Sequence, residues 1–302
     1  MLFHSVKALV GRTPLVELRR TQPPGVRILG KLEMLNPGGS VKDRVALALL
    51  EAASPPPGTV IIEATSGNTG IGLALVCAMM DLECIIVMPD SMSAERVSLI
   101  EAYGGRVVLT PGADGMTGAI AKAHALAAEI PQCMIADQFR NPANPMAHYA
   151  ATGPEIWEDT GGNIDIFVAG VGTGGTLTGV GRYLKERNPG IQIVAVEPAA
   201  SPLLSQGHSG SHGIQGIGPN FVPAVLDRSL IDAVIPVSEE AARQATRLLA
   251  QREGILAGIS SGAALHAAIQ IAQQSENAGK TIGVLLPDSG ERYLSTNLFR
   301  DR

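Results

Sequence analysis

The feature of this sequence that most constrains its fold is a regular alternation of strand-like and helix-like segments along nearly the whole chain. Short runs rich in β-branched residues predict strands at residues 27–34, 59–64, 83–89, 106–110, 164–170, 191–197 and 281–287. Apolar residues at helical spacing predict helices at 71–80, 94–104, 116–130, 239–254 and 261–274. Continuous apolar strands are typical of parallel sheets that are buried on both faces. The alternation therefore predicts an α/β protein with helices on both faces of mostly parallel, doubly wound sheets.

Length and composition narrow the classes of protein that the chain could be. Its 302 residues are enough for one large or two ordinary domains, and 45% of them are hydrophobic. The net charge of −5, without a basic cluster, argues against nucleic acid or an anionic membrane surface as a partner. No apolar run approaches the roughly 20 residues that cross a bilayer, and the first residues lack the pattern of a secretory signal. Cys77, Cys84 and Cys133 lie in apolar surroundings, so we expect free thiols in a cytoplasmic protein.

A lysine at the start of a predicted helix is the first candidate for chemistry. Residues 36–44 (NPGGSVKDR) combine a Pro-Gly-Gly loop with Ser40 as the expected N-cap and Asp43 as its capping-box partner. Lys42 then lies in the first turn, where the positive end of the helix dipole disfavours an ammonium group. Such a position favours loss of the proton and exposes a nucleophilic amine, although an isolated lysine here could also simply be solvated.

Two polar, glycine-rich turns follow predicted strands, where open α/β sheets bind their ligands. Residues 65–70 (TSGNTG) offer hydroxyls, an amide and helix N-terminal N–H groups that suit a carboxylate or a phosphate. Residues 172–176 (GTGGT) allow a phosphate to approach the backbone closely. With Gly170 they also match G-x-G-x-x-G, and Glu197 ends the next strand, where a dinucleotide fold would bind ribose. This second turn alone predicts either a phosphate cup or a dinucleotide site.

Two further patterns resemble functional sites without meeting their requirements. Residues 258–262 (GISSG) match the nucleophile elbow of α/β-hydrolases, but the last histidine, His266, lies only six residues further on in the same predicted helix. A hydrolase triad is therefore excluded. His208 and His212 are four residues apart in a loop rich in glycine and serine, and no H-E-x-x-H occurs, so we expect no metal site.

One chemistry uses an activated lysine, a phosphate cup, a carboxylate-binding turn and a serine hydroxyl together. A Schiff base of pyridoxal 5′-phosphate requires an amine, for which Lys42 is suited, and a phosphate cradle, for which residues 172–176 are suited. An amino-acid substrate adds an α-carboxylate, which residues 65–69 could bind.

Five segments carry a family resemblance: NPGGSVKDR, EATSGNTGIGLA, AGVGTGGTLTGVGRYLKE, AGISSGAA and SGERYLST. Together they resemble the cysteine synthases (O-acetylserine sulfhydrylases), which are fold-type II pyridoxal-phosphate enzymes with a tryptophan synthase β-like fold. The resemblance extends from residues 11–18 to residues 291–296, nearly the whole chain. As a set these motifs disfavour the dinucleotide interpretation.

The resemblance implies a role for each matching position. Lys42 would form the Schiff base, Asn68 would bond the ring hydroxyl of the cofactor, and Ser260 would face the pyridine nitrogen, with Ser261 as the alternative. The phosphate would be held by Gly172, Thr173, Gly174 and Thr176. The substrate carboxylate would be held by Thr65, Ser66, Thr69 and Gln138. A serine hydroxyl leaves the pyridine unprotonated, which favours β-elimination over deeper carbanion chemistry.

The implied reaction is a β-replacement with ping-pong kinetics. Lys42 removes the α-proton of O-acetyl-L-serine, acetate leaves, sulfide adds and L-cysteine is released. Residues 137–157 resemble the B isozyme, which in this family also accepts thiosulfate, whereas residues 213–223 and 286–296 resemble the A isozyme. We interpret the chain as the B isozyme. Use of thiosulfate or O-phosphoserine, cystathionine β-synthase activity, and a non-catalytic binding role on the same fold are the alternatives.

The resemblance also predicts the domain organisation and the partners. Residues 1–35 and 146–302 would form a larger cofactor-binding domain and residues 36–145 a smaller, mobile one, with the active site in the cleft between them. A homodimer is expected, and the family makes serine acetyltransferase a possible partner.

Overall fold

The chain, described by a computed structural model over residues 2–65 and 67–300, divides into two compact units. The first comprises Met1–Val10 and Asn36–Asn144, and the second comprises Gly11–Leu35 and Pro145–Arg302. The first ten residues thus group with the smaller unit, whereas the sequence analysis assigned them to the larger domain. Lys7 explains the difference, because it forms an ion pair with Glu51 of the first unit.

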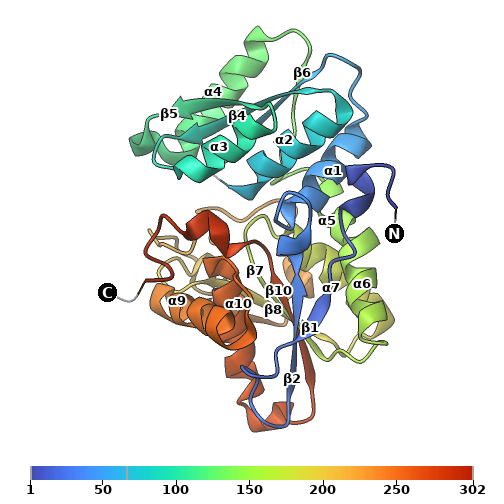
Figure 1. Cartoon of the computed structure of the whole chain (residues 1–302). Helices are drawn as coiled ribbons and strands as arrows, with labels where there is room; N and C mark the ends of the chain where they lie inside the picture. Colours follow the sequence, from blue (N-terminus) through green and yellow to red (C-terminus); the bar gives the residue numbers. More distant parts are fainter. Residues whose placement is uncertain (1, 66, 301–302) are drawn as a thin grey trace. The chain divides into compact units, whose positions relative to one another are not determined.

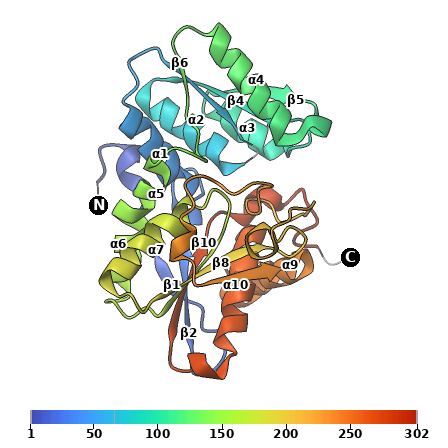
Figure 2. The same ribbon diagram turned by 180° about the vertical axis from the view of Figure 1, so that it is seen from behind.

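The first unit is a four-stranded sheet with every strand parallel, in the order β5–β4–β3–β6. Its strands are β3 (Val60–Ala64), β4 (Glu83–Pro89), β5 (Arg106–Thr110) and β6 (Cys133–Ile135). Its helices are α1 (Lys42–Ala53), α2 (Asn68–Met80), α3 (Ala94–Ala102) and α4 (Gly115–Glu129). Figures 1 and 2 show α2 and α3 on one face of this sheet and α4 on the other, as expected for a doubly wound sheet.

Consecutive isoleucines of strands β3 and β4 pack into two different hydrophobic clusters, one on each face of the sheet. Ile61 and Ile86 pack with residues of α1, α2 and α3, whereas Ile62 and Ile85 pack with Ala119 and Ala123 of α4. Because successive side chains of a strand point to opposite faces, a sheet covered on both faces needs apolar residues without alternation. This explains why these strands could be recognised as continuous apolar runs.

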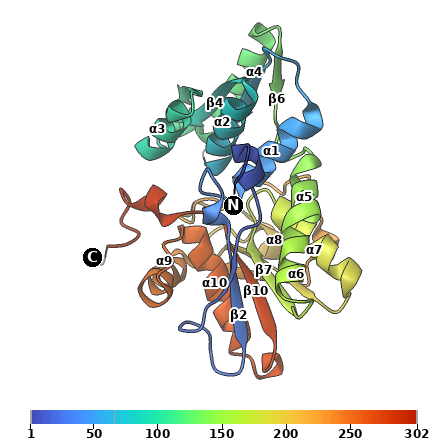
Figure 3. The same ribbon diagram turned by 45° about the vertical axis from the view of Figure 1, so that its right-hand side comes forward.

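The second unit contains a six-stranded sheet in the order β1–β2–β10–β7–β8–β9, in which only the pair β1–β2 is antiparallel. The strands are β1 (Leu15–Glu17), β2 (Arg27–Leu32), β7 (Ile166–Gly170), β8 (Gln192–Pro198), β9 (Ala233–Val237) and β10 (Thr281–Leu286). The helices are α6 (Gly153–Asp159), α7 (Gly175–Arg187), α8 (Leu203–Gln206), α9 (Glu239–Leu248) and α10 (Ile259–Ala272). Figure 3 shows α9 and α10 on one face of the sheet and α6 and α7 on the other.

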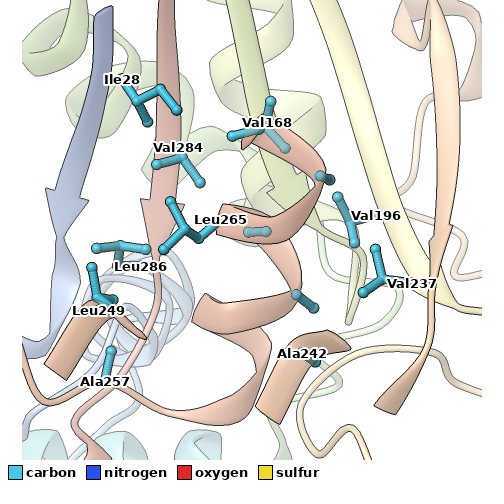
Figure 4. Close-up of a cluster of buried hydrophobic side chains, with 14 of the residues drawn as sticks. Ile28, Val168, Val196, Val237, Ala242, Leu249, Ala257, Leu265, Val284 and Leu286 are labelled. Atoms are coloured by element: carbon cyan, nitrogen blue, oxygen red, sulfur yellow. The ribbon is translucent and has the colours of Figure 1, made fainter. Parts of the chain in front are cut away.

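The main core of the second unit lies between this sheet and helices α9 and α10. Leu265 of α10 is fully buried there and packs among Val168, Val284 and Leu286 (Figure 4). Shorter helical segments complete the chain: α5 (Ala143–Ala147), π-helical turns at His148–Thr152 and Leu249–Glu253, and 3-10 turns at Val6–Leu9, Glu33–Leu35, Gly112–Asp114, Arg228–Leu230, Ser275–Asn277 and Gly290–Tyr293. Within the described residues, no helix is both long and apolar enough to cross a membrane.

Each sheet has one point at which the strand order reverses. In the first unit the chain runs outward through β3, β4 and β5, and then returns to place β6 on the other side of β3. In the second unit it runs through β7, β8 and β9, and then returns to place β10 beside β7. Ligands of open parallel sheets bind beyond the carboxyl ends of the strands at such reversals. The turns after β3, β6, β7 and β10 are therefore where site residues should lie.

Candidate active site

Lys42 is the first residue of α1, as the sequence predicted for a lysine in the first turn of a helix. The backbone N–H of Lys42 donates to Ser40 Oγ at 3.2 Å, so Ser40 serves the helix start although the capping position itself is Val41. Both parts of the expected capping box are therefore wrong, because Ser40 is not the N-cap and Asp43 bonds elsewhere. Asp43 Oδ2 accepts instead from the backbone N–H of Gly38 at 2.6 Å and closes the Pro-Gly-Gly loop. Asp43 is fully buried, so this bond fixes the loop that precedes Lys42.

The backbone of Lys42 is also held from the side by α2. A Cβ on Gly72 would lie 2.9 Å from the carbonyl oxygen of Lys42, so only glycine permits this approach of the two helices. Because α2 begins at Asn68, the close packing sets the first turn of α1 against the helix that carries Asn68 and Thr69. Lys42 itself is half-buried.

The proposed carboxylate-binding residues meet at the reversal point of the first sheet. The hydroxyl of Thr69, one residue into α2, donates to Gln138 Oε1 at 2.6 Å, and Gln138 lies beyond the end of β6. Asn144 Nδ2 donates to the carbonyl of Gln138 at 2.8 Å. The Thr69 hydroxyl and Asn144 thus hold Gln138 in place. Thr65, four residues before Thr69, is buried, and its hydroxyl accepts from the backbone N–H of Gly67 at 3.3 Å. Ser66 lies outside the described residues.

Glu63, which the sequence analysis missed, holds the backbone of the segment that carries Gln138. Its carboxylate accepts from the backbone N–H groups of Asp137 at 2.8 Å and of Gln138 at 3.3 Å. Asp137 has a φ of 52°, a left-handed conformation that is unfavourable for a residue other than glycine and is held here by its neighbours. Burial raises the pKa of Glu63 to about 7. An acidic residue inside a predicted buried strand was the available signal, because such residues are seldom buried without a role.

Replacing Glu63 by glutamine is expected to flatten the pH dependence of stability. The folded chain keeps the Glu63 proton up to about pH 7, whereas an unfolded chain releases it near the ordinary glutamate pKa of 4.5. The folded state therefore binds more protons between these values, and its free energy of unfolding falls as the pH rises, by up to about 3 kcal/mol. Urea unfolding at pH 5 and pH 7 would show this fall in the parent chain and a smaller one in Glu63→Gln. The exposed Glu101→Gln of the same unit should keep the parental slope, and equal slopes in all three would contradict the assignment.

The glycine-rich turn at 172–176 joins β7 to α7 at the reversal point of the second sheet. Gly174 has a φ of 81° and caps α7, and a Cβ on it would lie 2.7 Å from Leu226 Cβ. A Cβ on Gly172 would run into the carbonyl oxygen of Gly216. The N-cap Gly174 has no side chain, so the start of α7 resembles an anion-binding helix start. Thr173 Oγ1 accepts from the N–H of Gly175 at 3.3 Å.

Ser260 lies beside the same stretch of backbone. It is the second residue of α10, and its Oγ lies 3.7 Å from the position of a Cβ on Gly216, whose carbonyl abuts Gly172. Within the part of the chain that is described, no hydrogen bond involves the Ser260 hydroxyl. Ser261 also has no hydrogen-bond partner for its Oγ within the described residues, and it is fully buried. Of the two serines, Ser260 is the one next to the turn.

Two side chains from the patterns set aside in the sequence analysis, Glu197 and His212, have other hydrogen-bond partners in the structure. Glu197 accepts from the backbone N–H groups of Leu204 at 2.7 Å and Ser205 at 3.1 Å, so its carboxylate is committed to α8 and not to a ribose. His212 Nε2 is bonded to the carbonyl of Gly218 at 2.9 Å. Over residues 2–65 and 67–300, no group of three metal-ligating side chains comes together.

The residues of the second unit fit a phosphorylated ring cofactor. The turn is a cradle that side chains at Gly172 or Gly174 would fill, and two threonines and a helix start supply donors to an anion. Ser260 adds one neutral hydroxyl beside it. In the first unit, an amine lies at a helix start and two polar side chains, Thr69 and Gln138, are bonded to each other. Fold and residues together define an α/β enzyme that handles an amino acid with a phosphate-bearing cofactor.

The chain belongs to the pyridoxal-phosphate-dependent enzymes, whose family model matches residues 6–288. It is 50% identical to a cysteine synthase of Staphylococcus aureus over 98% of this chain and 96% of the relative. Among solved structures it is similar to a cysteine synthase of Entamoeba histolytica, with a TM-score of 0.96, 43% identity, and coverage of 100% of this chain and 92% of the other. It is also similar to an O-acetylserine-dependent cystathionine β-synthase of Helicobacter pylori, with a TM-score of 0.93, 41% identity and 99% coverage of both.

Proposed function

We propose that this protein is a cysteine synthase, which forms L-cysteine from O-acetyl-L-serine and sulfide with release of acetate. The observation that carries the proposal is the 50% identity to the Staphylococcus aureus cysteine synthase over nearly the full length of both chains. The bonded pair Thr69–Gln138 supports an amino-acid substrate, because it places two polar side chains at the start of α2, where a helix N-terminus can bind a carboxylate.

The residues divide between holding the cofactor and moving a proton. Pyridoxal phosphate supplies an electron sink for the bond that breaks at the α-carbon. Lys42 Nζ would hold the cofactor, and as a free amine it would take the α-proton of the substrate as a general base. Its place in the first turn of α1 favours the neutral amine that this step requires. Asn68, the first residue of α2, bonds the ring hydroxyl of the cofactor.

The remaining residues bind and orient. The cofactor phosphate is held by Gly172, Thr173, Gly174 and Thr176, and the substrate carboxylate by Thr65, Ser66, Thr69 and Gln138. Ser260, in preference to Ser261, faces the pyridine nitrogen, because its hydroxyl lies next to Gly216 and the phosphate turn. A neutral hydroxyl does not protonate that nitrogen, which favours loss of the β-substituent over other reactions.

An assay with matched substrates tests the proposal. Purified protein loaded with pyridoxal phosphate is expected to form L-cysteine from O-acetyl-L-serine and sulfide at least about tenfold faster than it uses thiosulfate, O-phosphoserine or homocysteine, a preference worth about 1.4 kcal/mol. A higher rate with homocysteine would favour the activity named for the Helicobacter pylori relative. A chain that binds the cofactor but converts none of these substrates would overturn the proposal.

We also propose that two copies of the chain associate in the cytoplasm. Leu2, Phe3, Val6 and Leu9 are all exposed within the first nine residues. A cluster of exposed apolar side chains in one segment supports an interface with a second copy. Light scattering on the purified protein should then give twice the chain mass of 31.3 kDa, and a monomer at micromolar concentration would contradict this.

A further inference from the structure

The backbone of the turn at 172–176 is rich in glycine, which can adopt many conformations, so contacts from elsewhere must hold it in one shape. Gly174 has a φ of 81° and caps α7. The place that a Cβ on Gly174 would occupy is closed by Leu226, whose Cβ and Cδ1 both lie 2.7 Å from it. Leu226 is buried, so its side chain packs directly on the backbone of Gly174. This contact restrains the turn from one side.

Thr178, a buried residue of α7, holds the segment that carries Leu226. Its hydroxyl donates to the carbonyl of Val225 at 3.0 Å and accepts from the backbone N–H of Asp227 at 2.9 Å. Chemistry fixes both directions, because a carbonyl oxygen can only accept and a backbone N–H can only donate. Leu226 is therefore fixed by a hydrogen bond on each of its two neighbours in the chain.

The backbone of Thr178 acts on the same glycine. Its N–H donates to the carbonyl of Gly174 at 2.9 Å and closes the first turn of α7. The carbonyl of Gly174 is thus bonded by the main chain of Thr178, and its Cα is covered by Leu226, which the hydroxyl of Thr178 holds. One residue therefore fixes the capping glycine of α7 both by a hydrogen bond and, through Leu226, by packing.

We propose that Thr178 is a positioning residue which, through Leu226, holds the turn at 172–176 in its phosphate-binding shape before the cofactor binds. The inference rests on the proposed function for the identity of that phosphate. A turn that is ordered in advance does not have to be ordered at the moment of binding, so this entropic cost does not reduce the affinity. Both side chains act through the backbone of Gly174.

Two substitutions of Thr178 separate its hydroxyl from its shape. Valine keeps the shape but leaves the Val225 carbonyl and the Asp227 N–H without their partner, whereas serine keeps the hydroxyl. Titrating pyridoxal phosphate into the full-length apoprotein, followed by visible absorption, is expected to give an affinity about tenfold weaker than the parent for Thr178→Val and within about threefold for Thr178→Ser. Equal affinities of these two variants would overturn the proposal.

Thr160→Val is the matched control for the loss of a threonine hydroxyl in the same unit. Thr160 lies at the end of α6, and its hydroxyl donates to the carbonyl of Ile156 at 2.8 Å. This variant should bind pyridoxal phosphate with the affinity of the parent. If it lost as much affinity as Thr178→Val, the effect would come from destabilisation of the unit, and the proposal would be wrong.

Leu226→Ala tests whether Thr178 acts through Leu226, because it removes the side chain that packs on Gly174. Alone it should weaken cofactor binding by about tenfold, since the turn then has to be ordered on binding. Adding Thr178→Val to this variant should cost less than about a further twofold, because the contact that the hydroxyl holds is already gone. A further loss of the full tenfold would mean that Thr178 acts independently of Leu226 and would contradict the proposal.

The order of the turn can also be measured without cofactor or turnover. NMR order parameters of the Gly174 and Gly175 amides in the full-length apoprotein are expected near the rigid-backbone value of about 0.85 in the parent and in Thr178→Ser, and below about 0.6 in Thr178→Val. A flexible turn in the parent, or an equally rigid one in Thr178→Val, would overturn the inference. If the parent bound no pyridoxal phosphate, the function proposed above would fail, and the order parameters would still decide whether Thr178 holds the turn.

Discussion

Replacing Lys42 by alanine is expected to lower kcat/KM for cysteine formation by about 10³-fold or more. A positioned general base alone contributes 10²–10⁴-fold, and Lys42 would also lose its role in holding the cofactor. The chain should remain folded, because the apolar residues of α1 that enter the core, such as Val45 and Leu49, are untouched. Initial rates with O-acetyl-L-serine and sulfide, measured beside the circular dichroism of each variant, would establish both statements.

Two control substitutions make this result specific to the amine at position 42. Lys42→Arg keeps the positive charge at the helix start, but a guanidinium does not release its proton near neutral pH, so this variant should be as inactive as alanine. Lys122 is an exposed lysine on α4 of the same unit, and Lys122→Ala should retain parental activity. A Lys42→Ala protein with more than about a tenth of the parental rate would exclude Lys42 as the base.

The parts of the fold that sequence analysis predicted are those fixed by local pattern. Strands β3, β4, β7, β8 and β10 are continuous apolar runs because both faces of each sheet are covered, and their predicted bounds lie within about two residues of those observed. The turns after β3 and β7 were equally visible, since a strand, a glycine-rich turn and a helix start are consecutive in sequence. Lys42 was found in the same way, from the predicted start of a helix.

The parts that were missed depend on pairing between distant segments. Strand β6 has only three residues and owes its existence to its pairing with β3, and β9 contains a proline. The bonds from Glu63 to the N–H groups of Asp137 and Gln138 span 74 and 75 residues. Gln138 was named only by resemblance, but the reversal of strand order beside β3 gives the physical reason for its place.

Sequence patterns also did not show which groups the buried polar side chains would bond. The sequence suggested that Asp43 would cap the helix, whereas its carboxylate binds the backbone N–H of Gly38 in the glycine loop. His148 likewise contacts Thr152 and Thr176, which lie 4 and 28 residues away. In both cases the side chain was visible in the sequence and its partner was not, because burial decides which donor must be satisfied.

Replacing Gly172 by alanine is expected to weaken the binding of pyridoxal phosphate by about 100-fold. The added Cβ would run into the carbonyl oxygen of Gly216, so either the turn or the segment that carries Gly216 must move. Gly216 also lies beside Ser260, and the shift therefore disturbs the phosphate cradle and the neighbouring hydroxyl together. A displacement of about 1 Å in such a site costs on the order of 10²-fold. Cofactor titration of the apoprotein by visible absorption would measure the loss.

Gly210→Ala is a matched control, because it creates the same kind of steric clash outside the turn at 172–176. A Cβ on Gly210 would run into the carbonyl oxygen of Ala200, which lies in the same unit and in the same long loop region as Gly216. Gly210→Ala should therefore lower the free energy of unfolding by an amount similar to Gly172→Ala, yet bind the cofactor with parental affinity. If both variants lost the cofactor equally, the loss would follow from destabilisation of the loop, and Gly172 would have no separate role in the cradle. If neither did, the turn at 172–176 would not be the phosphate site, because a site that depends on close backbone approach does not tolerate a methyl group pressed against it.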